Sequence, residues 1–439
     1  MTYEAAIQFL YELRWFGAKF GLAQVQRLAA LAGNPQDQLR FLHVAGTNGK
    51  GSTCAILESI YRRAGLRVGL FTSPHLVAFG ERIQVNRQPI GEAEIVRLVT
   101  DLQPLLDQFP KEEHPTFFEV VTVMALQHFR AQNCDLVIWE TGLGGRLDAT
   151  NLVTPLVSVI TNIQYDHQKY LGETLPSIAA EKAGIIKPGI PVVTGTECPA
   201  ALQVIADTAR SQNSPLTLVP AHAAHEPPLD SVHFPLLGEH QKRNAALALA
   251  VIRVLAPQFP VREEVIRTGL STVDWPGRLQ LVTLPTGQKI LLDGAHNVGG
   301  AETLATALQQ YFPATKPTFV LGILRDKDWK HMCEILAPLA GRILLVPVHS
   351  ERTAAPHGLA EACHRVNSSA PVDEFPSLAA ALAGTARDPF VAIAGSLYLI
   401  GEAMELLHVS ASQTTNERAL NEWGGGDPVL QPPPNQSPQ

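Results

Sequence analysis

A glycine-rich stretch, HVAGTNGKGST at residues 43–53, contains the residue types that bind the phosphates of a nucleotide. The usual phosphate-binding loop has the spacing G-x-x-x-x-G-K-[ST], whereas here only two residues separate Gly46 from the Gly49-Lys50 pair. The stretch follows an apolar strand and precedes a helix that we predict to begin near Ser52. Backbone N–H groups of the glycines, the positive end of that helix and the Lys50 charge can all bind phosphate oxygens. A turn that serves only packing is the alternative, but Gly-Lys-Gly-Ser at this position favours nucleotide binding.

Polar side chains follow the next apolar strands of the chain. Glu140 ends DLVIWE, and Asp166 and His167 come shortly after LVSVIT. Because ligands of open α/β sheets bind at the carboxyl ends of the strands, we expect these side chains to converge beside the phosphate loop. A carboxylate and an imidazole there could bind Mg²⁺, although Mg²⁺ prefers oxygen ligands and His167 alone could be an ordinary loop histidine. The glycine-rich turn at 142–145, with Asp148 close behind, would let the backbone approach a ligand.

The elements that must position these residues alternate along the chain. Short, wholly apolar strands separated by helical stretches are typical of a parallel sheet covered on both faces. Pro276-Gly277 interrupts the alternation and predicts a hinge, after which the pattern restarts on a smaller scale. We therefore predict an α/β protein: a parallel-sheet domain with a P-loop-type phosphate loop at 1–275, a smaller α/β domain at 276–409, and a disordered tail rich in Gln, Asn, Pro and Gly at 410–439.

The bulk composition narrows the function classes. Hydrophobic residues make up 46% and charged residues 17% of the 439 residues, which is ordinary for a globular protein. The net charge of -7 gives no general reason to expect a nucleic acid as partner. The five cysteines are scattered without a C-x-x-C pair, the N-terminal MTYEAAIQFLYELRWF predicts an amphipathic helix rather than a signal peptide, and the longest near-apolar run, 245–256, is too short to cross a membrane. We expect a cytoplasmic protein that binds no membrane.

Together, the motifs closely resemble the folylpolyglutamate synthase/dihydrofolate synthase family of the Mur ligase superfamily. The matching stretches run in family order from residue 43 to about 402: HVAGTNGKGST, FTSPHL, PTFFEVVT, ETGLGGRLDATN, SVITNIQYDHQKYLG, EKAGIIKPG, GEHQKRNAALA, PGRLQ, LDGAHN and AGSLYLIGE. The resemblance implies that 1–275 is a P-loop-type ATPase domain of the Mur ligase type and that 276–409 is a Rossmann-like ligase domain. It also implies an ATP-dependent amide ligase with Mg²⁺, in which ATP phosphorylates a substrate carboxylate and the amine of L-glutamate attacks the acyl phosphate. A carboxylate needs such activation because it is a poor electrophile, and phosphoryl transfer needs cationic clamps and metal ions.

The resemblance also implies roles for individual residues. It assigns ATP binding to Asn48, Gly49, Lys50, Gly51, Ser52, Asn244, Arg278 and Asp293, and metal binding to Ser73, Glu140 and His167. It assigns the acid substrate to Thr116, Phe117, Phe118, Glu119, Leu147, Asp148 and Ala149. Catalytic roles fall to Lys50, Lys182, His167, Arg278 and His296, and Lys182 matches a lysine that is carbamylated in the family. The alternatives are a helix-surface lysine for Lys182 and core packing for the two phenylalanines.

The substrates that the resemblance implies are small molecules: L-glutamate with 7,8-dihydropteroate, with a reduced folate, or with both. The GGRLDATN form favours a member that makes dihydrofolate, and the family suggests a monomer. A peptidoglycan Mur ligase is the nearest alternative, but Gly46 lies too close to Met1 to leave room for the extra N-terminal domain of those enzymes. A non-catalytic nucleotide switch is the second alternative, and it would not need a hinge and a second domain that carries Arg278 and Asp293.

Overall fold

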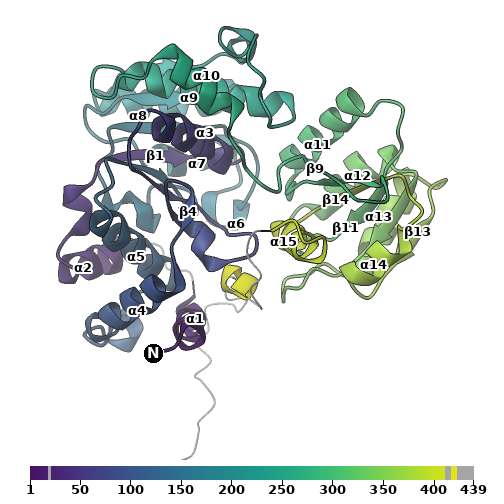
Figure 1. Ribbon diagram of the computed structural model, residues 1–439, viewed down its shortest axis with the longest axis horizontal. Coiled ribbons are helices and arrows are strands. Elements are labelled where there is room, and N and C mark those ends of the chain that lie inside the picture. Colours follow the sequence, from purple (N-terminus) through teal and green to yellow (C-terminus); the bar gives the residue numbers. More distant parts are fainter. Residues whose placement is uncertain (18–20, 411–416, 423–439) are drawn as a thin grey trace, which may run out of the picture.

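The structure is a computed structural model, and it describes residues 1–17, 21–410 and 417–422. Two α/β domains lie side by side, each built around its own sheet (Figure 1). The predicted fold class, a larger parallel-sheet domain followed by a smaller α/β domain, is confirmed.

The first sheet has eight strands in the order β4-β3-β2-β5-β1-β6-β7-β8. Six of them form a parallel sheet: β1 (Phe41–Ala45), β2 (Val68–Phe71), β5 (Leu136–Glu140), β6 (Val157–Ile160), β7 (Val192–Thr194) and β8 (Leu216–Leu218). The short strands β3 (Ile83–Val85) and β4 (Gln88–Pro89) add an antiparallel edge. In this register Val44 of β1 pairs with Glu140 of β5, and Ala45 pairs with Ile160 of β6. The carboxyl ends of the three central strands therefore meet at one edge.

Helices cover both faces of this sheet. One core cluster contains α1 (Tyr3–Glu12), α2 (Ala23–Leu31), α4 (Glu92–Leu106) and α5 (Phe117–Ala131). Another contains α3 (Lys50–Arg63), α9 (Glu239–Leu255) and α10 (Glu263–Ser271). The helices α6 (Gln168–Leu171), α7 (Leu175–Ala183) and α8 (Pro199–Ser211) complete the domain. Helix α3 begins at Lys50 rather than near Ser52, because Gly49 takes a left-handed conformation with φ 84° and starts the helix directly.

The second sheet has the order β13-β12-β11-β14-β10-β9. Five strands are parallel: β10 (Lys289–Leu292), β11 (Thr318–Leu321), β12 (Arg342–Leu345), β13 (Val372–Glu374) and β14 (Phe390–Ala394), and β9 (Gln280–Thr283) is an antiparallel edge. One face carries α11 (Val298–Tyr311), α12 (Trp329–Leu336) and α13 (Pro356–Val366). The other carries α14 (Leu378–Gly384) and α15 (Leu397–Leu406).

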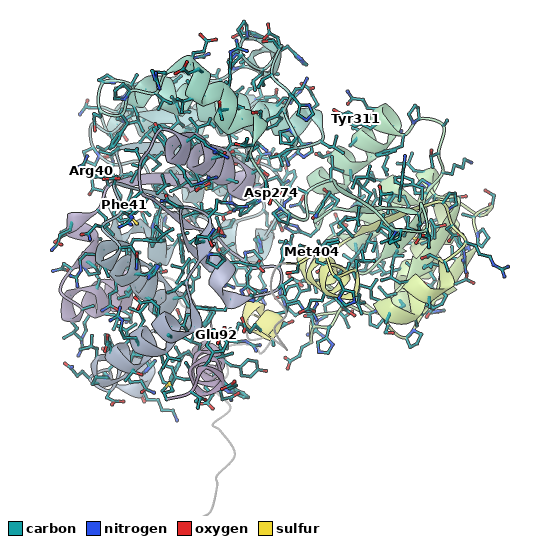
Figure 2. All side chains as sticks on the ribbon, viewed as in Figure 1. Arg40, Phe41, Glu92, Asp274, Tyr311 and Met404 are labelled. Carbon is teal, nitrogen blue, oxygen red and sulfur yellow. The ribbon has the colours of Figure 1, made fainter. Side chains whose placement is uncertain are left out.

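The chain crosses between the domains just after Asp274, which lies between them in Figure 2. Helix α15 of the second domain contacts the first domain directly, and Leu76 and Val77 belong to the same apolar cluster as its buried side chains. A Cβ atom on Gly401 of α15 would overlap the carbonyl of Leu76, so this helix approaches the first domain as closely as a backbone allows. The two domains therefore share a packed contact as well as the connecting strand of chain.

The predicted disorder of 410–439 is wrong for residues 417–422. Residues Glu417–Asn421 form a short 3-10 helix, and Glu417, Leu420 and Asn421 are buried. The composition of the whole tail hid this segment, in which an apolar Leu420 and hydrogen-bonding side chains replace the surrounding Gln, Pro and Gly. The rest of the predicted tail, 411–416 and 423–439, lies outside the described residues. Within the described part of the chain, no helix is both long and apolar enough to cross a membrane.

Candidate active site

One cleft of about 670 Å³ opens between the two domains. We call it the interdomain cleft. Every site residue predicted from the sequence lines it: Asn48, Gly49, Lys50, Gly51, Ser52, Ser73, Thr116, Phe117, Phe118, Glu119, Glu140, Leu147, Asp148, Ala149, His167, Lys182, Asn244, Arg278, Asp293 and His296. The fold thus brings the whole predicted set together, from both sides of the hinge.

The phosphate loop runs from the end of β1 into α3. Lys50 Nζ donates to the carbonyl oxygens of Gly46 and Thr47, at 3.2 Å each, so its ammonium lies over the loop. A Cβ at Gly46 would overlap the Thr161 hydroxyl, and the Trp275 ring lies 2.8 Å from where a Cβ of Gly51 would stand. Because Gly46 and Gly51 have no side chains, Thr161 after β6 and Trp275 of the hinge region can approach the loop backbone.

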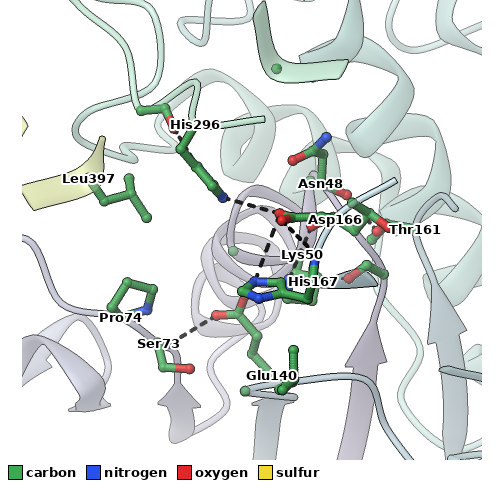
Figure 3. A pocket seen from close by; sticks show the side chains of 18 of the residues that line it. Asn48, Lys50, Ser73, Pro74, Glu140, Thr161, Asp166, His167, His296 and Leu397 are labelled. Atoms are coloured by element: carbon green, nitrogen blue, oxygen red, sulfur yellow. Dashed lines mark hydrogen bonds and ion pairs between the residues drawn. The ribbon is translucent and has the colours of Figure 1, made fainter. Parts of the chain in front are cut away.

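Glu140 lies at the carboxyl end of β5 and is buried. Its Oε2 accepts a hydrogen bond from the backbone N–H of Ser73 at 3.1 Å (Figure 3). Burial raises the pKa of this carboxyl group to about 7, and the nearby Lys50 charge opposes the rise. A cation bound beside Glu140 would remove much of that burial cost, because it would supply the opposite charge that the ionised form lacks.

The Glu140 position fits Mg²⁺ by its donor chemistry. Proteins usually bind Mg²⁺ with one or two carboxylates, waters and substrate phosphates rather than with a complete cage. Glu140 supplies such a carboxylate, Ser73 lies next to it, and the phosphate loop borders the same cleft. The residues present can therefore hold the metal once a nucleotide brings its phosphates.

A second cluster gathers around Asp166, just beyond β6. Its carboxylate accepts from Lys327 Nζ at 2.6 Å and from Asn297 Nδ2 at 2.9 Å, and His296 Nε2 lies 3.7 Å away. Figure 3 shows the His296 and His167 rings directed toward this carboxylate. Burial opposes its ionisation, but Lys327 and the two histidines hold the pKa of Asp166 well below its usual range. Because Lys327, His296 and Asn297 belong to the second domain, Asp166 joins the two halves of the cleft.

His167, which was predicted to bind a metal, lies beside a lysine in this structure, and its role in metal binding stays a prediction. Its Nε2 lies 3.5 Å from Lys327 Nζ and 3.9 Å from Asp166 Oδ2, so a lysine ammonium already supplies the positive charge there. Burial and the Lys327 charge lower the pKa of His167 to about 3. Across the described residues, no three His, Cys, Asp or Glu side chains are grouped so that they could hold a metal ion.

Lys182 is buried on α7, and the alternative of a surface lysine is wrong. Its Nζ donates to the carbonyl oxygen of Gly46 at 2.8 Å, directly behind the phosphate loop. Burial, helped by the positive charge of Lys50, lowers the pKa of Lys182 to about 7. A large fraction of this amine is therefore uncharged at neutral pH, which is the form that reacts with electrophiles.

The second domain contributes Arg278 and Asp293 from either side of β9 and β10. Asp293 accepts from the backbone N–H groups of Leu279 and Ala295, at 2.8 and 2.9 Å, so it fixes the backbone around its neighbour Arg278. Arg278 is itself held by a hydrogen bond to the carbonyl oxygen of Gly277. Asn244 of α9 lies so close to Gly49 that a Cβ atom on Gly49 would overlap the Asn244 side chain.

Several residues predicted to bind the acid substrate already form hydrogen bonds within their own local structure. Thr116 and Glu119 cap helix α5 reciprocally, with the Thr116 N–H and hydroxyl both donating to Glu119 Oε2 at 2.8 Å. Phe117 is buried in the core, as the alternative interpretation allowed, whereas Phe118 is half-buried. Asp148 accepts from the N–H groups of Leu143 and Thr150 at 2.7 and 3.0 Å. It therefore orders the glycine-rich turn in addition to any contact with a substrate.

Sequence reasoning missed several residues of the cleft, above all Lys327, Arg14, Arg82 and Arg352, and also Asn297, which donates to the cleft residue Asp166. Lys327 lies in the loop after the apolar strand TFVL, as Asp166 lies in the loop after β6, so the strand-end rule could have found it. The arginines carried no such signal, because their positions depend on contacts between segments far apart in the sequence.

Comparison with known proteins decides the family. A profile of the Mur ligase middle domain matches residues 44–218, and a profile of the Mur ligase glutamate ligase domain matches residues 277–397. A dihydrofolate synthase/folylpolyglutamate synthase of Bacillus subtilis is 37% identical over 428 residues, which cover 92% of this chain and 99% of that protein. The chain belongs to the dihydrofolate synthase/folylpolyglutamate synthase family. The resemblance predicted from the motifs is thereby confirmed.

Solved structures of the dihydrofolate synthase/folylpolyglutamate synthase family have the same two-domain fold. The Mycobacterium tuberculosis folylpolyglutamate synthase complexed with ADP and AMPPCP superposes with a TM-score of 0.82 at 28% identity, covering 92% of this chain and 99% of that chain. The E. coli FolC protein in complex with DHPP and ADP superposes with a TM-score of 0.81 at 30% identity, covering 94% and 99%. The assignment to the ATP-dependent ligases of this family agrees with the nucleotide-binding geometry of the cleft.

Proposed function

We propose that this protein joins L-glutamate to 7,8-dihydropteroate, and to the glutamyl end of reduced folates, at the expense of ATP. The observation that carries the proposal is the composition of the interdomain cleft. A phosphate loop, a buried carboxylate at Glu140 and a cluster that joins both domains at Asp166 line one cavity. The named activities of the Bacillus subtilis and E. coli relatives support the same reaction.

The phosphate loop and the second domain would prepare the transfer of the γ-phosphoryl group. Lys50 lies over the loop and can neutralise charge on the phosphates, while Arg278 faces the same cleft from the second domain. Bound at Glu140 and Ser73, Mg²⁺ would supply further positive charge to the phosphate oxygens. An oxygen of the acid's carboxylate then attacks the γ-phosphorus, ADP leaves, and an acyl phosphate forms.

Glutamate completes the reaction when its amine attacks the acyl carbon and phosphate leaves. Asp166, Lys327 and His296 hold the two domains together on the side of the cleft where both domains supply charge. Closure around the substrates would exclude water, which otherwise hydrolyses the acyl phosphate. Because every one of the residues in these roles comes from one chain, we propose that a monomer suffices for activity.

Lys182 fits the role of a carbamylated lysine. Its depressed pKa supplies the neutral amine that adds to CO₂ with loss of a proton, and the remaining N–H can still donate to the carbonyl oxygen of Gly46. The product is a carboxylate behind the phosphate loop, opposite the charge of Lys50. We propose that this carboxylate orients Lys50 and any cation bound at the loop.

The acid would lie along the wall formed by α5 and the glycine-rich turn. Phe118 presents a half-buried ring there, and the Asp148 carboxylate lies in the same wall. A pteridine has a flat face and an edge rich in donors, which suits this pair.

Product analysis tests the proposed function. Purified protein is incubated with ATP, MgCl₂, L-glutamate and either dihydropteroate or tetrahydrofolate, and the products are identified by mass spectrometry. We expect dihydrofolate from the first acid and a glutamate-extended folate from the second, each with one ADP. ADP release that needs neither acid nor amine would instead indicate a nucleotide switch. If the protein extends tetrahydrofolate but does not convert dihydropteroate, the dihydrofolate synthase part of the proposal is wrong.

A further inference from the structure

Arginines gather at one end of the interdomain cleft. Arg14 comes from the N-terminal region, Arg82 from the segment before β3, and Arg352 from the loop after β12. Arg82 also lies over the Phe117 ring, at 5.3 Å from its centroid. This arginine end of the cleft therefore adjoins the wall proposed for the acid substrate.

Residues 417–422, which we call the C-terminal segment, occupy this arginine end. Arg14 Nε donates to the carbonyl oxygen of Glu422 at 2.8 Å, and Arg82 donates to the side-chain oxygen of Asn421. Arg352 Nε lies 3.4 Å from Glu422 Oε2. Each arginine thus directs a donor at this segment, and Leu420, Asn421 and Glu422 themselves line the cleft.

The C-terminal segment is anchored by contacts at its first residue. Tyr3 donates to Glu417 Oε1 at 2.8 Å, the Phe79 N–H donates to Oε2 at 2.6 Å, and His75 donates to the Glu417 carbonyl oxygen at 3.0 Å. At the other end the Tyr398 hydroxyl of the second domain donates to the carbonyl oxygen of Asn421. The placement of the segment beside the arginines is therefore determined by buried contacts to both domains.

The Glu422 carboxylate accepts fewer hydrogen bonds from the described residues than its two oxygens could accept. Its side chain is 7% exposed, yet none of the described residues donates a hydrogen bond to its buried Oε1. Its partner Arg352 is shared with Asp326 at 3.3 Å and with the Tyr398 hydroxyl at 3.0 Å. A buried carboxylate oxygen without a donor is unfavourable, so a better-paired carboxylate could displace Glu422 from the arginines.

We propose that the C-terminal segment is an internal competitor for the carboxylates of glutamylated substrates and so selects against acids with long glutamyl chains. This inference rests on the proposed function. Glu422 presents to the arginines the same group that each added glutamate presents, whereas dihydropteroate has only the carboxylate that reacts. A substrate with a chain of glutamates must displace Glu422 before it can pair with Arg14 and Arg352, while dihydropteroate need not.

Kinetics with acids of different chain length test the inference. The variants are Glu422→Gln, which keeps the shape and removes the charge, and a chain that ends at residue 410. Glu361→Gln is the matched control, since this carboxylate is 74% exposed and pairs with the exposed His357 at the surface of α13. KM is measured for dihydropteroate and for tetrahydrofolate with one and with three glutamates. For Glu422→Gln we expect the KM ratio of dihydropteroate to the triglutamate to rise at least fivefold, with a smaller rise for the monoglutamate and none for the control.

An unchanged ratio in Glu422→Gln would overturn the inference, as would a ratio that falls, because the segment would then be part of the site that binds the chain. The shortened chain should show the same direction of change, and if it does not fold, Glu422→Gln decides. If the unaltered protein ligates glutamate to none of these acids, the proposed function fails instead, so the two failures are distinguishable.

Discussion

Replacing Lys327 by methionine removes the positive charge that joins the two domains at Asp166. The two side chains are 7% and 8% exposed, and Nζ lies 2.6 Å from the carboxylate, so the pair is almost completely shielded from water. Removing one partner of a buried ion pair costs about 3–5 kcal/mol, because the other charge stays buried without compensation. Since about 1.4 kcal/mol corresponds to a tenfold change, the closed arrangement should become roughly a hundredfold or more less favourable. If catalysis requires that arrangement, kcat/KM should fall by the same factor.

The assay follows ADP release coupled to ligation for Lys327→Met, Asp166→Asn and the double variant. Lys330→Met, an exposed lysine three residues along the chain, is the matched control and should retain activity. We expect the double variant to lose less than the sum of the two single losses, with a coupling of at least about 1.5 kcal/mol, because the second substitution removes the uncompensated charge. A Lys327→Met enzyme with activity within twofold of the original, or singles whose effects simply add, would refute the reasoning.

Four further predictions concern three residues of the cleft and His43, which is buried in β1. Lys50→Ala should lower turnover by roughly two orders of magnitude while circular dichroism and thermal unfolding stay unchanged, because transition-state charge stabilisation is lost; near-normal turnover would contradict the role. Lys182→Ala should be inactive and partly rescued by acetate, and a bare ammonium at this position together with an active variant would exclude the carbamate. Asp148→Asn should raise KM for dihydropteroate more than KM for tetrahydrofolate, and equal effects would mean that it only orders the turn. Burial lowers the pKa of His43 to about 3. Below pH 6.5 the unfolded chain therefore binds a proton at this histidine that the folded chain does not bind, so the free energy of unfolding falls as pH falls. Urea unfolding should show that His43→Gln loses about 2 kcal/mol less than the original protein between pH 7 and 5, whereas the exposed His222→Gln should lose the same amount as the original.

Much of the fold was predictable because the signals are local. The apolar runs that predict strands and the turns that end them depend on neighbouring residues, and the amphipathic helix predicted at the N-terminus matches α1. The rule that ligands bind at the carboxyl ends of strands predicts Glu140 and Asp166 beside the phosphate loop from the sequence alone. These parts of the site follow from strand order and register alone.

The remaining parts depend on contacts between distant segments, which no local pattern encodes. The pairing of Asp166 with Lys327 spans 161 positions, and that of Arg82 with Asn421 spans 339. The approach of Lys327 to His167 is another contact of this kind, and it places a positive charge beside a residue that the resemblance implies is a metal ligand. Composition misled the prediction at 417–422, where a few specific hydrogen bonds outweigh an otherwise polar and glycine-rich context.

The central claim is that ATP activates a carboxylate as an acyl phosphate, and oxygen transfer tests it most directly. Dihydropteroate labelled with ¹⁸O in its carboxylate is converted with ATP and L-glutamate, and the released phosphate is analysed by mass spectrometry. The account predicts one ¹⁸O atom in each phosphate, because the bond that breaks joins the acyl carbon to an oxygen that began in the acid. Unlabelled phosphate would show that water attacks ATP instead, and would contradict the ligase mechanism.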